Sequence, residues 1–293
     1  MRVFVTGATG LVGSAVVAEL IAHGHTVLAL ARSDASATAA EGAGTQVVRG
    51  ALADLEILRA GAAETDGVIH LAFANDFSSA DALAKAIAEE TAALATLGDA
   101  LIGSGRPLVT VSGTPLVPGR PSTEADPALT DGPVGGRGRA VTAALGLASR
   151  GVRSSAVRLP RTVHNKGLGG FAGLLTNIAR QLGVAGYPGD GWQRWPAVHA
   201  LDAAALFRIA LERAESGTSW HAVADEGDKV QDIAAVIGRR LILPVESVAA
   251  KFFGALGPIF LADQPSSSTY TRKTLGWTPT HPGLLEDLEN IVP

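Results

Sequence analysis

A glycine-rich turn near the start of the chain restricts the fold more than any other feature of the sequence. Residues 6–13 read TGATGLVG, directly after the β-branched run Arg2–Thr6 and at the start of an alanine-rich helical segment. Glycines here allow a tight turn, let a pyrophosphate approach the backbone and bring helix against sheet. The free N–H groups of the helix then face the anion. We therefore predict a dinucleotide site formed by Gly7, Thr9, Gly10, Leu11, Val12 and Gly13.

Short apolar runs alternate with helical segments through the first third of the chain. Runs such as residues 27–30 and 68–71 are apolar on both faces, which is typical of parallel strands covered by helices on two sides. This alternation predicts an α/β fold with a Rossmann, doubly wound parallel sheet. The expected strands are Arg2–Thr6, Thr26–Ala31 and residues 45–49, 67–73 and 107–112, and the expected helices are residues 11–23, 54–62 and 80–104.

The second half of the chain is less regular and predicts a smaller C-terminal lobe. Residues 115–133 are rich in proline, glycine and small polar residues, which indicates a loop. Later segments predict helices over residues 138–150, 201–214, 230–240, 248–261 and 283–291, and strands over 152–159 and 220–224. We expect residues 1–163 and 196–225 to form the nucleotide-binding domain, and residues 164–195 and 226–293 the substrate-binding lobe.

The end of the second predicted strand indicates which dinucleotide is bound. A site for NAD usually places an acidic residue there to bind the ribose 2′-hydroxyl, and this chain has Ala31. The next residue, Arg32, offers a forked cation to a 2′-phosphate, and Ser33 adds a hydroxyl. The alternative is that Arg32 is a solvated surface residue and that Asp34 holds the ribose. We expect NADPH as the cofactor, with NADH bound more weakly.

Composition excludes several classes of protein. The 24 Lys and Arg residues against 28 Asp and Glu give a net charge of −4, which provides no excess of cations for nucleic acid. The chain has no cysteine, so disulfides, thiolate metal sites and a cysteine nucleophile are excluded. Apolar runs fall short of the roughly 20 residues that cross a bilayer, and strand-like sequence from Arg2 leaves no signal peptide. We expect a cytoplasmic protein, monomeric or homodimeric, with no nucleic-acid or membrane partner.

Several further motifs resemble those of the NAD-dependent epimerase/dehydratase family within the extended short-chain dehydrogenases/reductases. They are residues 6–13, GVIHLAF at 67–73, VTVSGT at 109–114, VRLP at 157–160, WPAVH at 195–199 and LGWTP at 275–279. The resemblance implies a Rossmann domain with a small C-terminal lobe. It places adenine near Leu52, the cofactor groove along Leu71, Ala72 and Phe73, and the nicotinamide near Pro160.

The chain departs from this family at its catalytic centre. The family uses a Ser or Thr on the fifth strand, with a Tyr and a Lys four residues apart on the next helix. Counting back from Arg158 places Gly135 at the tyrosine position and Arg139 at the lysine position. An arginine does not transfer protons near neutral pH, because its pKa exceeds about 12. Either the chain binds its cofactor without chemistry, as a sensor or scaffold, or the proton comes from elsewhere.

A substrate with a phenol beside its ketone could supply that proton. The sequence is similar to atypical ketoreductases that act on such polycyclic aromatic polyketides, of angucyclinone type, in antibiotic biosynthesis. We therefore expect an NADPH-dependent ketoreductase with a small aromatic ketone as substrate, acting without the Tyr/Lys pair.

Three residues are candidates for catalysis. Ser112 and Thr114 lie at the end of the fifth predicted strand, where ligands of open α/β sheets bind, and either hydroxyl could donate to an alkoxide. His164 follows Pro160 and could act as a general acid. Each has a structural alternative, as a strand end, a turn or a hydrogen-bonded loop histidine. His70, inside an apolar strand, is interpreted as a core residue, and no spacing indicates a metal site.

A flat apolar pocket is expected for such a substrate. Phe73 and Asn75 follow the fourth predicted strand, and Trp192 lies in a glycine-rich turn where a large ring is costly to expose. We predict that Phe73, Asn75 and Trp192 line the mouth of this pocket. The alternative is that the aromatic side chains only form the core of the lobe.

Overall fold

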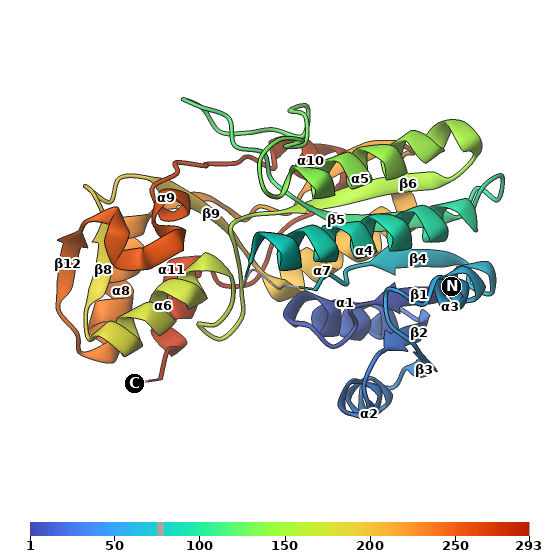
Figure 1. Cartoon of the computed structure of the whole chain (residues 1–293), viewed down its shortest axis with the longest axis horizontal. Helices are drawn as coiled ribbons and strands as arrows, with labels where there is room; N and C mark the ends of the chain where they lie inside the picture. Colours follow the sequence, from blue (N-terminus) through green and yellow to red (C-terminus); the bar gives the residue numbers. More distant parts are fainter. Residues whose placement is uncertain (75–78, 293) are drawn as a thin grey trace.

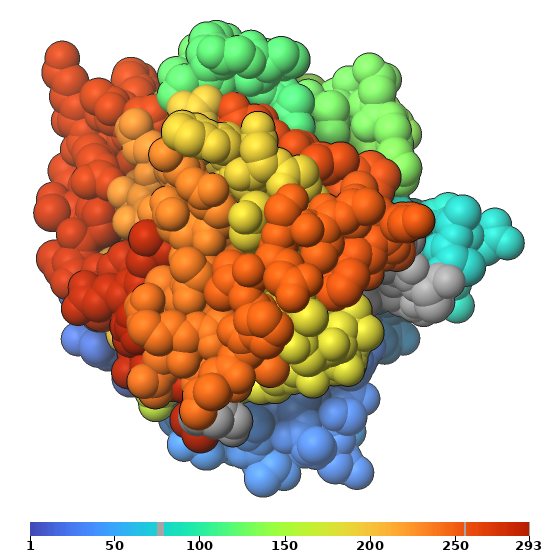
Figure 2. Space-filling model, turned by 90° about the vertical axis from the view of Figure 1, so that its left-hand side faces the viewer, coloured from blue at the N-terminus to red at the C-terminus, as the bar shows by residue number. Residues whose placement is uncertain are grey.

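A computed structural model describes residues 1–74 and 79–292, so the predicted substrate residue Asn75 lies outside the described residues. The chain forms a large parallel sheet at one end and a smaller lobe at the other (Figure 1). Viewed from the lobe, Figure 2 shows its yellow, orange and red segments in front, with the blue N-terminal part below them. Among the described residues, no helix is long and apolar enough to cross a membrane.

The large sheet has seven strands in the order β10-β6-β5-β4-β1-β2-β3, and all its pairings are parallel. The chain runs outward from β1 through β2 and β3, then returns to the other side of β1 and continues through β4, β5 and β6. The strand order therefore reverses beside β1, which is where doubly wound sheets bind ligands. This sheet confirms the predicted fold class. Its strands are β1 Arg2–Thr6, β2 Thr26–Ala31, β3 Gln46–Arg49, β4 Gly67–His70, β5 Pro107–Gly113, β6 Arg153–Leu159 and β10 Thr218–His221.

Helices cover both faces of this sheet. On one face, Val3 and Val5 belong to a hydrophobic cluster that includes α1 Leu11–Ala22 and α7 Ala200–Arg213. On the other face, Phe4 belongs to a second cluster. Alternate side chains of one strand thus pack into opposite layers, as the apolar runs predicted. The second cluster includes α3 Leu55–Ala63, α4 Ala80–Asp99 and α5 Gly135–Gly146.

The lobe has a core of its own, built around Trp195 and Phe260. Two small sheets contribute to it, with the strand orders β11-β9-β7 and β12-β8. The strands are β7 Thr162–His164, β8 Ala185–Pro188, β9 Arg194–His199, β11 Asp225–Lys229 and β12 Val245–Val248. The helices are α6 Gly170–Leu182, α8 Val230–Leu241, α9 Gly257–Phe260 and α11 Leu284–Asp287, with the short 3-10 turns η2 Ala250–Leu256 and η3 Leu288–Asn290.

One late segment packs against the large sheet instead of the lobe. Helix α10, Thr269–Leu275, contacts α7 and β10, and Trp277 is buried in the cluster beside α1 and α7. The indole N–H of Trp277 donates to the carbonyl of Asp202 at 2.9 Å. Residues 269–277 therefore belong by packing to the nucleotide-binding half, although they lie within the range expected for the lobe.

Local structure differs from the sequence-based expectation at several points. Helix α2, Asp34–Gly42, and helix α6 had no sequence-based prediction. The helix predicted over residues 248–261 is interrupted at Gly254, whose φ of 55° and ψ of −133° break the helical hydrogen bonding. Helix α5 begins earlier than predicted and is followed by the 3-10 turn η1, Leu147–Arg150. These differences lie at glycines and short turns, where hydrophobic periodicity carries little information.

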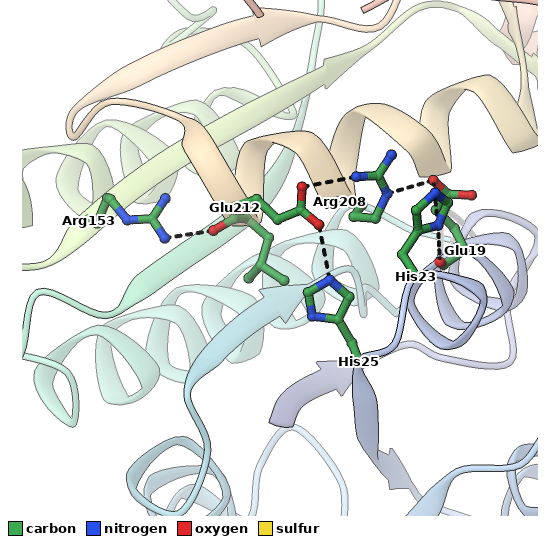
Figure 3. Close-up of polar contacts among 7 residues, drawn as sticks. Glu19, His23, His25, Arg153, Arg208 and Glu212 are labelled. Atoms are coloured by element: carbon green, nitrogen blue, oxygen red, sulfur yellow. Dashed lines mark hydrogen bonds and ion pairs between the residues drawn. The ribbon is translucent and has the colours of Figure 1, made fainter. Parts of the chain in front are cut away.

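A polar network joins the end of α1, the end of α7 and the residue before β2 (Figure 3). It lies at the amino ends of the strands, whereas the glycine turn follows the carboxyl end of β1. Arg208 of α7 contacts Glu19 of α1 at 2.7 Å and Glu212 at 2.9 Å. Glu212 also contacts Nε2 of His25 at 3.0 Å. Burial acts to raise the pKa of Glu212, but hydrogen bonds from His25 and Arg208 lower it below its ordinary value. The network holds two helices of one layer together away from the candidate site.

Candidate nucleotide and substrate site

The glycine turn between β1 and α1 has no room for larger residues at two positions. Gly7 has a φ of 76°, and a Cβ there would lie 2.8 Å from the amide nitrogen of Ala72. A Cβ on Gly13 would lie 1.9 Å from the carbonyl oxygen of Gly7. Among the described residues, no side chain caps the start of α1 at Gly10. The first N–H groups of the helix are therefore available to an anion such as a dinucleotide pyrophosphate, and the turn fits that group.

The end of β4 is attached to the glycine turn through Thr6. Because Thr6 pairs with His70 in register, their side chains meet, with Oγ1 and Nδ1 2.8 Å apart. The amides of Leu71 and Ala72 also donate to Thr6 Oγ1, each at 3.3 Å. Burial lowers the pKa of His70 to about 4, and the Arg137 cation acts in the same direction. His70 is therefore a buried residue that is neutral at neutral pH, and its partner Thr6 holds the backbone expected to line the cofactor groove.

The corner after β2 carries two arginines. Arg32 and Ser33 are exposed, and Ser33 caps α2 by accepting the amide of Ser36 at 3.2 Å. Arg49, at the end of β3, contacts the Asp34 carboxylate at 2.7 Å and donates to the carbonyl of Ser33. The negative charge of Asp34 is thus paired, while Arg32 has no hydrogen bond or ion pair with any described residue. Half-buried Leu52 follows β3 and packs against the cluster of α3 and α4.

The predicted hydroxyls lie at the carboxyl end of β5. Ser112 is half-buried and pairs in register with Arg158 of β6. Thr114 is 6% exposed, and its amide donates to the carbonyl of Leu159 at 3.0 Å. The Thr114 hydroxyl is buried without a hydrogen-bond partner among the described residues. An unpaired buried hydroxyl is costly, so a hydrogen bond to a ligand oxygen would stabilise it. Pro160 is buried and directly follows β6.

The positions that the resemblance assigns to the family's tyrosine and lysine, Gly135 and Arg139, hold no equivalent group. A Cβ on Gly135 would lie 2.3 Å from the carbonyl oxygen of Thr130, so the backbone leaves no room for a side chain. Arg139 is exposed and donates to that same carbonyl. Tyr187 lies in β8 of the lobe, and Tyr270 lies in α10 with its ring stacked on Trp220 at 5.7 Å. Neither tyrosine is on α5.

The structure places a different cation at the start of α5, which sequence reasoning missed. The guanidinium of Arg137 lies 3.9 Å above the ring of Phe73. Its Nε and Nη2 both donate to the Glu90 carboxylate of α4 at 2.8 Å. Glu90 is only 3% exposed. Glu90 lies in an amphipathic helix, where an acidic residue normally indicates a solvated face, so only its unusual burial reveals the pair.

His164, the predicted general acid, is buried and has a carboxylate partner. His164 is buried on β7, and its Nδ1 lies 2.8 Å from the Asp287 carboxylate, which also accepts the Gly167 amide at 3.0 Å. Burial acts to raise the pKa of Asp287, but the Gly167 amide and His164 lower it below its ordinary value. The Nε2 atom of His164 is buried without a described partner.

Trp192, predicted at the mouth of the substrate pocket, is 60% exposed, with the Lys229 ammonium 3.8 Å above its ring.

Comparison with known proteins places the chain among NAD-dependent enzymes. Residues 3–223 match the model of the NAD dependent epimerase/dehydratase family. The chain is 42% identical over 292 residues to an uncharacterised protein of Schizosaccharomyces pombe, covering 98% of each. It is 43% identical over 297 residues to an uncharacterised protein of Saccharomyces cerevisiae, again covering 98% of each. A partial match, 32% identical over 135 residues, covers 41% of this chain and 40% of the 4-hydroxy-2-methyl-3-oxo-4-farnesyl-3,4-dihydroquinoline-1-oxide ketoreductase of Stigmatella aurantiaca.

Solved structures agree on the fold. The UDP-glucose 4-epimerase of Thermotoga maritima superposes with a TM-score of 0.80 at 18% identity, covering 99% of this chain and 97% of the epimerase. The UDP-glucose 4-epimerase of Stenotrophomonas maltophila, with bound NAD, gives a TM-score of 0.79 at 20% identity, covering 99% and 96%. Because the family match includes the glycine turn and the ends of β4, β5 and β6, the chain belongs to the NAD-dependent epimerase/dehydratase family of the extended short-chain dehydrogenases/reductases.

Proposed function

We propose that the protein is an NADPH-dependent ketoreductase for a cyclic ketone that carries a hydroxyl beside the reacting carbonyl. The observation that carries this proposal is the pairing of a glycine turn shaped for a dinucleotide with Gly135 at the tyrosine position. Bound NADPH would supply a hydride to the carbonyl carbon. The carbonyl oxygen must then gain one proton, so that the ketone becomes a secondary alcohol.

The choice of NADPH rests on the corner after β2. Arg32 is exposed and unpaired within the part of the chain that the structure describes, so a 2′-phosphate can approach it. Asp34, the alternative ribose ligand, is engaged by Arg49. A forked guanidinium suits a phosphate better than it suits a neutral ribose hydroxyl. These contacts favour NADPH over NADH.

The proton would come from the substrate. No side chain can stand at Gly135, and Arg139 is held by the carbonyl of Thr130. The free hydroxyl of Thr114, or that of Ser112, would donate a hydrogen bond to the developing alkoxide. The name of the Stigmatella relative describes a cyclic ketone with a hydroxyl on the adjacent ring carbon, which supports a hydroxy-ketone substrate, although that hydroxyl is a tertiary alcohol and not a phenol. We propose angucyclinone-type aromatic polyketides, formed in antibiotic biosynthesis, as the first class to test.

The test compares such a hydroxy-ketone with its methyl ether. We expect NADPH absorbance to fall with the hydroxy-ketone, and we expect the ether to remain unreduced while the Kd for NADPH is unchanged. A positioned general acid is worth about 10²–10⁴ in rate, so its loss is measurable. Ser112→Ala and Thr114→Ala should each slow the reaction partially. Normal reduction of the ether, or complete loss of activity in His164→Ala alone, would show that the protein supplies the proton.

A second candidate is a sensor or scaffold that binds NADPH without reducing a substrate. It is favoured by the lack of a side chain at Gly135 and by the exposure of Arg139, which donates to the carbonyl of Thr130. The two functions differ in one measurement. The purified protein is mixed with NADPH and a panel of aromatic ketones. Consumption of NADPH with any of these ketones excludes the inert protein, whereas tight NADPH binding without consumption across the panel supports it.

A further inference from the structure

Arg161 occupies a central position between the sheet and the lobe. It directly follows Pro160 at the end of β6, and its Nε donates to Gln264 Oε1 at 2.7 Å. Its Nη1 donates to the carbonyl of Ile259 in α9 at 2.8 Å. The amide group of Gln264 in turn donates to the carbonyl of Thr114 at 2.7 Å. One side chain thus links the end of β6, the lobe and the backbone that carries the free Thr114 hydroxyl.

This guanidinium is a half-buried cation without a matching negative charge among the described residues. It lies 5.2 Å from the ring centre of Phe171 and 5.8 Å from that of Trp195. Among the residues described, no Asp or Glu forms an ion pair with it, and its Nη2 makes no hydrogen bond. Burial lowers the pKa of Arg161 to about 10, so the group remains charged at neutral pH. Part of the residue stays exposed.

Several other arginines in this fold have carboxylate or helix-end partners, whereas Arg158, which is 5% exposed, resembles Arg161 in forming no ion pair with a described residue and donates to the carbonyls of Glu124 and Asp126. Arg137 is paired with Glu90, and Arg208 with Glu19 and Glu212. Arg106 donates to three carbonyls at the end of α3, where the helix dipole is negative. Arg161, in contrast, donates to only two acceptors, the carbonyl of Ile259 and the neutral side-chain amide of Gln264. A half-buried cation left in this state is stabilised by an anionic ligand.

We propose that Arg161 binds the substrate hydroxyl that gives up the proton, and stabilises the oxyanion that this hydroxyl becomes. This inference rests on the proposed ketoreductase function. During reduction, the O–H bond of the substrate breaks, the proton moves to the former carbonyl oxygen, and the electron pair stays on the substrate as a phenolate beside Arg161. Solvent then restores the phenol proton. A hydrogen bond to a charged group contributes more than a neutral one, so Arg161 favours the ionised product of this step.

The experiment measures the ionisation of a bound hydroxy-ketone. The probe is 1-hydroxyanthraquinone, whose visible absorbance changes when its hydroxyl ionises, bound with NADP⁺ so that no turnover occurs. We expect the pKa of the probe hydroxyl to fall on binding by about one unit or more, corresponding to a tenfold or larger preference for the anion. We expect this shift to disappear in Arg161→Gln and to persist in part in Arg161→Lys. The methyl ether of the probe should bind equally to all three proteins.

Controls separate this inference from a purely structural role and from the proposed function. Arg180→Gln alters an exposed arginine of α6 that contacts the carbonyl of Val292, and it should leave the probe shift intact. If NADPH does not bind to the wild type, the proposed function fails. If NADPH binds and ketones are reduced, but the probe shows no shift in the wild type or an equal shift in Arg161→Gln, only the inference about Arg161 is overturned. The wild-type measurement stands even where Arg161→Gln does not fold.

Discussion

Arg137 and Glu90 form a two-point ion pair that joins α5 to α4, with the guanidinium stacked on the ring of Phe73. Both bonds are 2.8 Å long, and the carboxylate is almost fully buried, whereas 30% of the Arg137 side chain is exposed. The pair lies beside the end of β4, near the backbone that follows His70. The Arg137 guanidinium is therefore held in a fixed position next to the candidate site.

Removing the cation of this pair should destabilise the protein. Arg137→Ala leaves Glu90 buried without its partner, and breaking a buried pair costs about 3–5 kcal/mol, with the lower end expected here because Arg137 is partly exposed. Urea denaturation measures the change. The double variant Arg137→Met with Glu90→Leu should recover part of the loss, because no charge is then left unpaired. Glu56→Ala, in the exposed pair with Arg59, should stay within about 0.5 kcal/mol of the wild type. Equal effects of Glu56→Ala and Arg137→Ala would contradict this account.

Gly13→Ala should abolish tight nucleotide binding. The new Cβ would overlap the Gly7 carbonyl at 1.9 Å, so the turn or the start of α1 must shift. We expect the Kd for NADPH, measured by calorimetry, to rise more than about tenfold, since the phosphate site is made of this backbone. Gly42→Ala is the matched control, because its Cβ would meet no atom within 4 Å. Unchanged binding in Gly13→Ala would place the cofactor elsewhere.

Arg32→Ala should weaken the binding of NADPH much more than the binding of NADH. Loss of a charged hydrogen bond of about 1.5–3 kcal/mol predicts a roughly 10–100-fold weaker affinity for NADPH, with little change for NADH. Arg59→Ala, on the outer surface of α3, controls for loss of net charge. Equal wild-type affinities for the two cofactors, or equal losses in Arg32→Ala, would favour the ribose-binding alternative at Asp34.

Stability should fall in mild acid because of His70. The folded state depresses the pKa of this histidine from 6.5 to about 4, so the unfolded chain binds more protons in that interval. Its contribution is therefore complete above pH 6.5 and is lost as the pH falls toward 4, by about 2 kcal/mol between pH 7.5 and pH 5. His221, whose pKa burial also lowers to about 4, acts in the same sense. The His70→Asn variant should show a flatter dependence of unfolding free energy on pH. A wild-type slope that His70→Asn leaves unchanged would contradict this assignment.

The sequence alone predicted the parallel sheet and the glycine turn, and it has Gly135 where the resemblance places the family's tyrosine. Each of these is visible in short stretches, because glycine spacing and the periods of strands and helices depend on neighbouring residues. Strands β1 and β2 agree with the predicted ranges for this reason.

Tertiary structure decided which charged groups meet at the candidate site. Arg137 pairs with a residue 47 positions away, Arg161 with one 103 positions away, and His164 with one 123 positions away. No local pattern in a single sequence encodes such partners, because an acidic residue in an amphipathic helix and an amide in a loop are normally solvated. Burial between packed layers removes that water, and each polar group then takes the partner that the fold brings within reach.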